Sequence, residues 1–151
     1  MKAEANHMLD CVGELVQRMA GDSAIVRIAH MELAEPTIAQ GFAECVRAGA
    51  TDVVAFPYML SPGKHSTRDI PRMVTEAAAP YPGVRFTVTT AFGVNEKLAE
   101  VVLDRAGVQP SPGSADAAGC VRPAGAPERF CGDGCREISA ARATTGAARR
   151  A

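Results

Sequence analysis

The feature that most constrains the fold is a regular alternation of helical and extended patterns from residue 4 to residue 107. Four stretches place apolar residues at helical spacing: 4–19, 36–48, 68–79 and 95–106. Three short apolar runs lie between them and are typical of strands: 24–29, 52–56 and 84–90. Short connections and this order predict right-handed βαβ units and a parallel sheet, which is an α/β fold.

The alternation opens on a helix, whereas an α/β unit usually opens on a strand. Three parallel strands make a small sheet with one poorly supported side. We therefore expect either that a first strand is missing from this chain or that a partner covers the sheet. The run 52–56 is nearly all apolar, which predicts a strand covered on both faces.

Composition and charge argue against several classes of protein. The 151 residues are enough for one domain with a proper core, and an aromatic content of 5% with no Trp predicts a mainly aliphatic one. A net charge of −1 argues against a nucleic-acid partner. No apolar run approaches the roughly 20 residues that span a bilayer, and the first residues show no targeting signal. We expect no membrane and no nucleic acid among the partners.

Periodicity is lost after Gly107, so we expect residues 1–107 to form the domain and the Pro/Gly/Ala/Arg-rich stretch 108–151 to be a largely disordered tail. Two of the five cysteines, Cys11 and Cys45, lie in helical patterns as small hydrophobic residues. The other three are in the tail: Cys120, Cys131 and Cys135. Their spacing is looser than the usual CxxC pair, so they are either unpaired thiols or part of a metal cluster completed by another ligand.

The stretch from 53 to 71 carries the strongest site signal. A strand-like run ends in the loop Ser61-Pro62-Gly63-Lys64-His65, and Ser66 and Asp69 follow with capping-box spacing. Pro71 suits the first turn of the helix. A histidine at the carboxyl end of a strand is a candidate metal ligand or proton acceptor; the alternative is a solvated surface histidine.

Basic residues surround this histidine. Lys64, Arg68 and Arg72 suit a substrate with many carboxylates, or they form an ordinary solvated surface.

The other two loops at strand ends carry polar residues as well. The first holds His30, Glu32 and Glu35, and the third holds Asn95. Glu35 precedes Pro36 and the start of a helix, where a carboxylate is favoured, so it is a site residue or a helix-end carboxylate. We expect Glu32 to be a solvated loop charge and His30 to be a core or edge histidine. No phosphate-binding glycine motif is present, so no nucleotide is expected.

Four ordered motifs lie between Ala5 and Gly107: Ala29-His30-Met31-Glu32-Leu33-Ala34-Glu35-Pro36, then Phe56-Pro57-Tyr58-Met59-Leu60-Ser61-Pro62-Gly63-Lys64-His65, then Asp69-Ile70-Pro71, then Asp104-Arg105. With them the chain resembles the small type II chelatases of the CbiX/SirB family, which insert cobalt or ferrous iron into sirohydrochlorin. The first motif is most similar to the sirohydrochlorin ferrochelatases of plants, algae and cyanobacteria.

The resemblance implies a three-layer chelatase-like domain and a sirohydrochlorin ferrochelatase or cobaltochelatase of siroheme or cobalamin biosynthesis, with Fe²⁺ or Co²⁺ as substrate. It implies that His65 is the metal ligand and that His65 and Glu35 are catalytic. Substrate contacts would come from Glu35 and the loop residues Leu60, Ser61, Pro62, Gly63, Lys64 and His65. It further implies a homodimer, a plastid location in a plant or alga and otherwise the cytoplasm, and a [2Fe–2S] cluster on Cys120, Cys131 and Cys135.

One departure from the family is large. Its members begin with an apolar strand ending in His-Gly-Ser, just before the segment that matches residues 2–6, and this histidine is normally a metal ligand and proton acceptor. We therefore expect slow or absent metal insertion by this chain alone. The alternatives are a non-catalytic tetrapyrrole- or metal-binding module or subunit of an intact chelatase, and an iron–sulfur or zinc protein defined by the tail.

Overall fold

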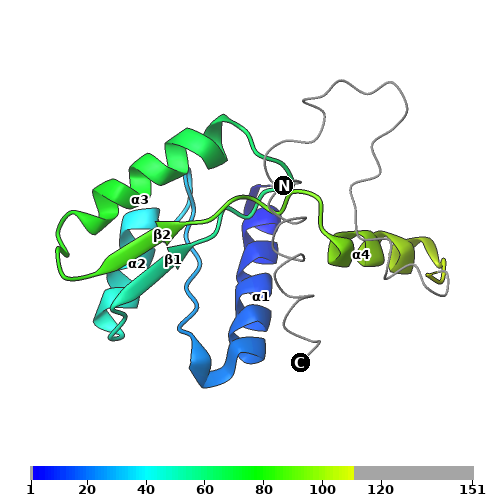
Figure 1. Ribbon diagram of the computed structural model, residues 1–151, viewed down its shortest axis with the longest axis horizontal. Helices are drawn as coiled ribbons and strands as arrows, with labels where there is room; N and C mark the ends of the chain where they lie inside the picture. The colour runs from blue at the N-terminus through cyan, green and yellow to red at the C-terminus, as the bar shows by residue number, and fades with distance from the viewer. Residues whose placement is uncertain (1, 111–151) are drawn as a thin grey trace, which may run out of the picture. The chain divides into compact units, whose positions relative to one another are not determined.

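The computed structural model describes residues 2–110, with side chains from residue 7 onward. Its elements follow the chain in this order (Figure 1): α1 (Lys2–Ala20), the 3₁₀ turn η1 (Gly21–Ser23), α2 (Ile38–Arg47), β1 (Asp52–Ala55), the π-helical turn η2 (His65–Asp69), α3 (Ile70–Ala78), β2 (Arg85–Val88) and α4 (Glu96–Ala106). The described residues form two compact units, one of 2–57 with 63–89 and one of 58–62 with 90–110.

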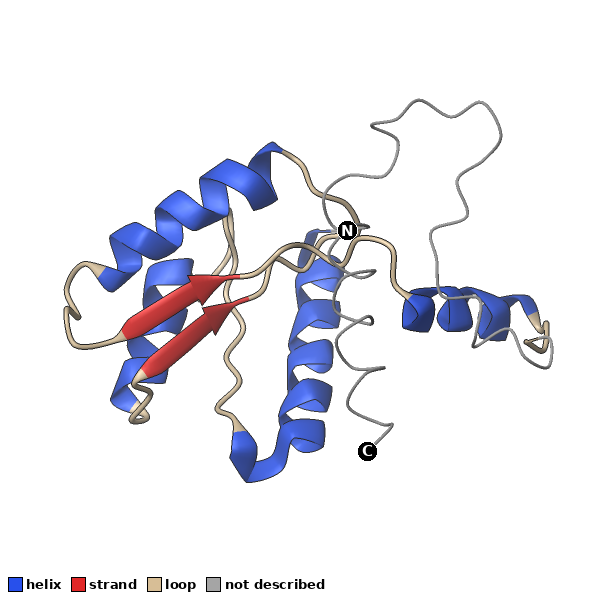
Figure 2. Cartoon of the chain, in the orientation of Figure 1, coloured by secondary structure: helices blue, strands red, loops and turns tan. Residues whose placement is uncertain are grey.

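The sheet of the first unit is parallel, as the alternation predicted. Strands β1 and β2 run side by side in the same direction (Figure 2), in a register that pairs Asp52 with Arg85 and Ala55 with Val88. Hydrogen bonds from Arg85 N to Thr51 O and from Thr89 N to Ala55 O, both 2.9 Å, extend the pairing. The chain crosses from one strand to the other through α3, which is the βαβ connection of α/β folds.

The prediction of a third strand at 24–29 is wrong for the described chain. This segment is extended, but no backbone–backbone hydrogen bond joins it to another described residue. The Gln17 side chain of α1 takes the place of a neighbouring strand: its Nε2 donates to Ala24 O at 2.9 Å, and its Oε1 accepts from Val26 N at 2.8 Å. The segment is extended because of its own sequence, but a strand also needs a paired backbone.

Two glycines bring helices close to this extended segment. A Cβ atom at Gly13 of α1 would lie 2.4 Å from the Ile28 side chain, and one at Gly41 of α2 would lie 3.0 Å from Ala29 Cβ. Successive side chains of an extended chain point to opposite faces, so Ile28 meets α1 while Ala29 meets α2. The segment therefore forms a middle layer between two helices, which is the layering expected of this fold class.

The core of the first unit lies on one face of the sheet, where α2 packs against α3. Phe42 is 4% exposed and contacts two aromatic rings. It stacks on Tyr81 with the ring centroids 5.8 Å apart and meets Phe86 edge to face with the centroids 6.4 Å apart. Four aliphatic residues of α3 complete the core: Ile70, Val74, Ala77 and Ala78.

The expectation that the strand at 52–56, here β1, is covered on both faces is wrong. Val54 of β1 is 67% exposed. It shares its face of the sheet with the ion pair of Asp52 and Arg85, whose Nε and Nη2 donate to the carboxylate at 2.6 and 2.8 Å. The helices α2 and α3 pack on the opposite face of the sheet, where Phe86 also lies. The apolar sequence of the strand therefore did not determine which of its faces is buried.

The second unit is small and is tied by the backbone. Phe92 N donates to Met59 O at 2.9 Å, and Gly93 N donates to Leu60 O at 3.0 Å. Helix α4 begins and ends as predicted: Asn95 caps it by accepting from Lys97 N at 2.9 Å, and Gly107 follows with φ +67°. Within residues 2–110, no helix has the length and apolarity to cross a membrane.

Candidate functional site

The loop after β1 ends in the helical turn η2, which carries His65. Helical hydrogen bonding already begins at Gly63, whose carbonyl accepts from Thr67 N at 2.9 Å. Buried Ser66 is held inside this turn: its Oγ accepts from Gly63 N at 2.9 Å and donates to Gly63 O at 3.1 Å. The predicted capping box of Ser66 and Asp69 is therefore wrong, because the chain winds into a helix before Ser66. Pro71 lies in the first turn of α3, as predicted.

The Asp69 side chain holds the imidazole of His65. His65 Nδ1 and Asp69 Oδ2 are 3.0 Å apart, and Arg68 Nε donates to Asp69 Oδ1 at 3.2 Å. An ionised carboxylate can only accept, so Nδ1 must donate to it. In the neutral ring Nε2 then carries no proton and is available to bind a metal or accept a proton. The His65 side chain is 54% exposed, so this nitrogen is accessible.

The surrounding cations keep this carboxylate charged. Partial desolvation would raise the pKa of Asp69, but the hydrogen bond and charge of Arg68, the hydrogen bond of His65 and the charge of Lys64 outweigh it. The pKa of the Asp69 carboxyl therefore lies below its usual range. At neutral pH, Asp69 is an acceptor that holds the imidazole in one orientation.

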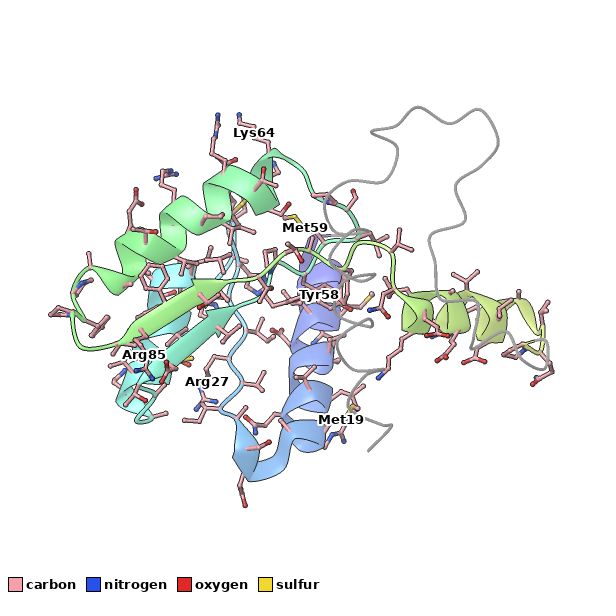
Figure 3. The ribbon with its side chains drawn as sticks, in the orientation of Figure 1. Met19, Arg27, Tyr58, Met59, Lys64 and Arg85 are labelled. Carbon is pink, nitrogen blue, oxygen red and sulfur yellow. The ribbon has the colours of Figure 1, made fainter. Side chains whose placement is uncertain are left out.

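The three predicted basic residues are not equivalent. Arg68 donates a hydrogen bond to Asp69, and Arg72 Nη1 donates to Glu76 Oε1 at 2.6 Å. Lys64 makes no direct ion pair with any described residue, and Figure 3 shows its side chain projecting away from the start of the turn. Lys64 is therefore the cation of this turn most available to an external carboxylate.

The residues of the first loop lie at the entry to α2. His30 is 8% exposed, and its backbone N donates to Pro36 O at 2.7 Å, which agrees with a core or edge histidine. Glu32 and Glu35 are exposed. Glu35 lines a shallow depression with side chains of α2. One of them, Gln40, forms a capping box with Thr37 at the start of the helix.

The structure brings only part of the predicted site together. Of the predicted residues, Lys64, His65 and Arg68 share one turn of the first unit with Asp69, and Gly63 begins this turn. Leu60, Ser61 and Pro62 belong to the second unit, as does Asn95, whose side chain caps α4. Cys120, Cys131 and Cys135 lie outside the described residues. Within the described part, no three His, Cys, Asp or Glu side chains are grouped as a metal site.

Asp69 is the residue whose part in the site the sequence reasoning missed. Its spacing of four residues from His65 was the available signal, because residues at i and i+4 face each other on a helix. The spacing alone was ambiguous, since Asp69 also fitted a capping box with Ser66.

Together, the fold and the turn define a small parallel α/β protein with an oriented, accessible imidazole after the carboxyl end of a strand, where such folds bind ligands. The family profile of CbiX matches residues 2–108, and the chain belongs to this family. It is 39% identical over 104 residues to a protein of Arabidopsis thaliana named sirohydrochlorin ferrochelatase, chloroplastic, covering 69% of this chain and 46% of that protein. The chain thus spans about half the length of this relative.

Solved structures with the same fold include two of SirB from Bacillus subtilis. One, with Fe³⁺, superposes with a TM-score of 0.58 at 30% identity, covering 65% of this chain and 39% of the other. The second, the sirohydrochlorin chelatase SirB from Bacillus subtilis subspecies spizizenii in complex with cobalt, has a TM-score of 0.55 at 27% identity, covering 66% and 44%.

Proposed function

We propose that this protein takes part in inserting Fe²⁺ or Co²⁺ into sirohydrochlorin, as a ferrochelatase or cobaltochelatase. The observation that carries the proposal is the turn η2, in which Asp69 orients His65 and leaves its Nε2 accessible. Membership of the CbiX family and the names of the relatives support the substrate and the two metals.

The chemistry of metal insertion gives His65 and Glu35 their proposed roles. Metallation removes pyrrole N–H protons and passes a divalent ion to the ring nitrogens. An imidazole binds such ions and also accepts protons near neutral pH, so His65 would deliver the metal or take a proton. By the family resemblance, Glu35 would be the second catalytic group, and it is an exposed carboxylate at the entry to α2.

Substrate binding would depend on the loop Leu60 to His65. Sirohydrochlorin is rich in carboxylates, and an ammonium that pairs with no described carboxylate is suited to hold one of them. We therefore assign Lys64 to the rim of the substrate. Two residues of this loop, Lys64 and His65, support the proposal because both are exposed.

Assembly and location follow from the family resemblance. The protein would act as a homodimer, in the plastid if it comes from a plant or alga and otherwise in the cytoplasm. Cys120, Cys131 and Cys135 would hold a [2Fe–2S] cluster if another residue or a partner supplies the missing ligand position.

Titration with sirohydrochlorin, followed by fluorescence quenching, tests the binding step. Lys64→Ala/His65→Ala should bind more weakly than the parent chain. Arg72→Ala is the matched control, because Arg72 lies on the neighbouring helix α3 and is already paired with Glu76. Equal affinity of the double variant and the parent would refute the assignment of this loop.

Absorbance during incubation with Co²⁺ or Fe²⁺ then separates the enzyme from its alternative, a non-catalytic tetrapyrrole- or metal-binding module or subunit of an intact chelatase. Insertion that slows in His65→Ala supports the enzyme. Tight binding of sirohydrochlorin with no insertion above the rate without protein would favour the module.

A further inference from the structure

Helix α1 carries a histidine and a cysteine that the proposed function does not use. His7 and Cys11 are one turn apart, and both side chains are exposed. Residues at i and i+4 lie on the same face of a helix, and here the two reactive atoms face each other, with His7 Nε2 and Cys11 Sγ 4.0 Å apart. Such a separation is long for a hydrogen bond but short enough for two ligands of one ion.

The distance fits a bridging metal ion. Zinc bonds of about 2.3 Å to sulfur and about 2.0–2.1 Å to nitrogen place the two ligand atoms about 3.6 Å apart at a tetrahedral angle and about 4.4 Å apart in a straight line. The observed 4.0 Å lies between these limits, so a small side-chain rotation would bring both ligand atoms into a bonding position. The helix fixes the backbone of both residues, which lowers the entropic cost of chelation.

We propose that His7 and Cys11 form a chelating site for a divalent ion of borderline softness, Co²⁺ or Zn²⁺, on the surface of α1. Imidazole and thiolate are both preferred ligands of these ions. On binding, the Cys11 thiol releases its proton to water and the sulfur bonds to the metal as a thiolate. Within the described residues, no third His, Cys, Asp or Glu is placed to join these two ligands.

The other described cysteine provides an internal comparison. Cys45 of α2 is partly buried, and burial raises the pKa of its thiol, an effect that Arg27 opposes and Glu44 reinforces. Among the described residues, no hydrogen bond joins its side chain to a histidine. Cys45 is thus a poor thiolate ligand, whereas the Cys11 side chain is exposed and faces a histidine.

Titration with Co²⁺ under anaerobic conditions tests the site, because a thiolate ligand gives cobalt a near-ultraviolet charge-transfer band that imidazole alone does not. The parent should be the full chain with Ser at Cys120, Cys131 and Cys135, so that tail thiols cannot contribute. We expect the band to appear and to saturate at an intensity that corresponds to one cobalt–thiolate bond per chain. Cys11→Ser should abolish it, and His7→Ala should shift the midpoint to higher Co²⁺.

Two controls leave the proposed ligands in place. Cys45→Ser should retain the band with an unchanged midpoint, and His65→Ala should retain the band. Absence of the band in the parent, its survival in Cys11→Ser, or an unchanged midpoint in His7→Ala would each overturn the proposal. Both ligand residues are exposed, so their variants should fold, and circular dichroism checks that α1 is intact.

Discussion

Replacing Asp69 with Asn should disturb His65 more than the small change in shape suggests. The two carboxylate oxygens serve different donors, His65 Nδ1 at 3.0 Å and Arg68 Nε at 3.2 Å. An amide has only one oxygen. If that oxygen faces His65, the amide N–H groups face the Arg68 donor. If it faces Arg68, the amide N–H groups face Nδ1, which must then accept and move the ring proton to Nε2.

The second arrangement blocks the nitrogen proposed to bind metal. Groups that orient a ligating histidine are typically worth about 10–100-fold in metal affinity or activity. The His65 side chain is 54% exposed, so water can replace part of the lost contact, and we expect about a tenfold loss in the rate of metal insertion. Removing the competing donor in Arg68→Ala/Asp69→Asn should restore part of the rate, because the amide oxygen is then free for His65.

Two-bond ¹H–¹⁵N NMR of the histidine rings is the direct assay, and the chain has only three histidines to assign. At a pH where the ring is neutral, His65 should carry its proton on Nδ1 in the parent and shift toward Nε2 in Asp69→Asn. The matched control is Glu76→Gln, which removes a carboxylate from an ion pair on α3 that does not involve His65. A parent His65 protonated on Nε2, or a tautomer that Asp69→Asn leaves unchanged, would refute the reasoning.

Two further predictions concern stability. Phe42→Ala should lower the free energy of unfolding by about 3–5 kcal/mol, because it removes a buried ring that stacks on Tyr81 and meets Phe86; urea denaturation should show a smaller loss for Phe42→Leu, and equal losses would contradict a packing role for the ring. The pKa of Asp52 lies below its usual range because Arg85 donates to it, and that of Asp69 is low because its cations outweigh desolvation. Both carboxylates therefore stabilise the fold above the ordinary aspartate range, and this contribution is lost as the pH falls through their folded pKa values. The free energy of unfolding, measured against pH, should therefore fall less steeply on the acid side in Asp52→Asn/Asp69→Asn than in the parent. An unchanged slope would count against both ion pairs.

Local sequence determined where most helices begin and end. Helices α2 and α4 lie close to their predicted bounds, and the structure shows the caps there: Thr37 with Gln40, Asn95 with Lys97, and Gly107. A cap depends on a few neighbouring residues and on the φ that glycine tolerates. The alternation of apolar runs was enough to predict a parallel sheet. Ser66 is the exception, because it does not cap a helix as predicted. The helical turn already begins before it, and its side chain bonds to Gly63.

The tertiary structure decided which extended segments pair as strands, which face of the sheet is buried and which partners the charged groups contact. Whether 24–29 becomes a strand depends on a neighbouring backbone, and here a side chain, Gln17, satisfies part of it. Whether Val54 is buried depends on what packs over its face of the sheet. Sequence placed three cations beside His65, but only the folded chain showed that Arg68 and Arg72 have carboxylate partners and that Asp69 holds the imidazole. In each case, several groups of the chain could form the same contact. The local sequence does not determine which of them forms it.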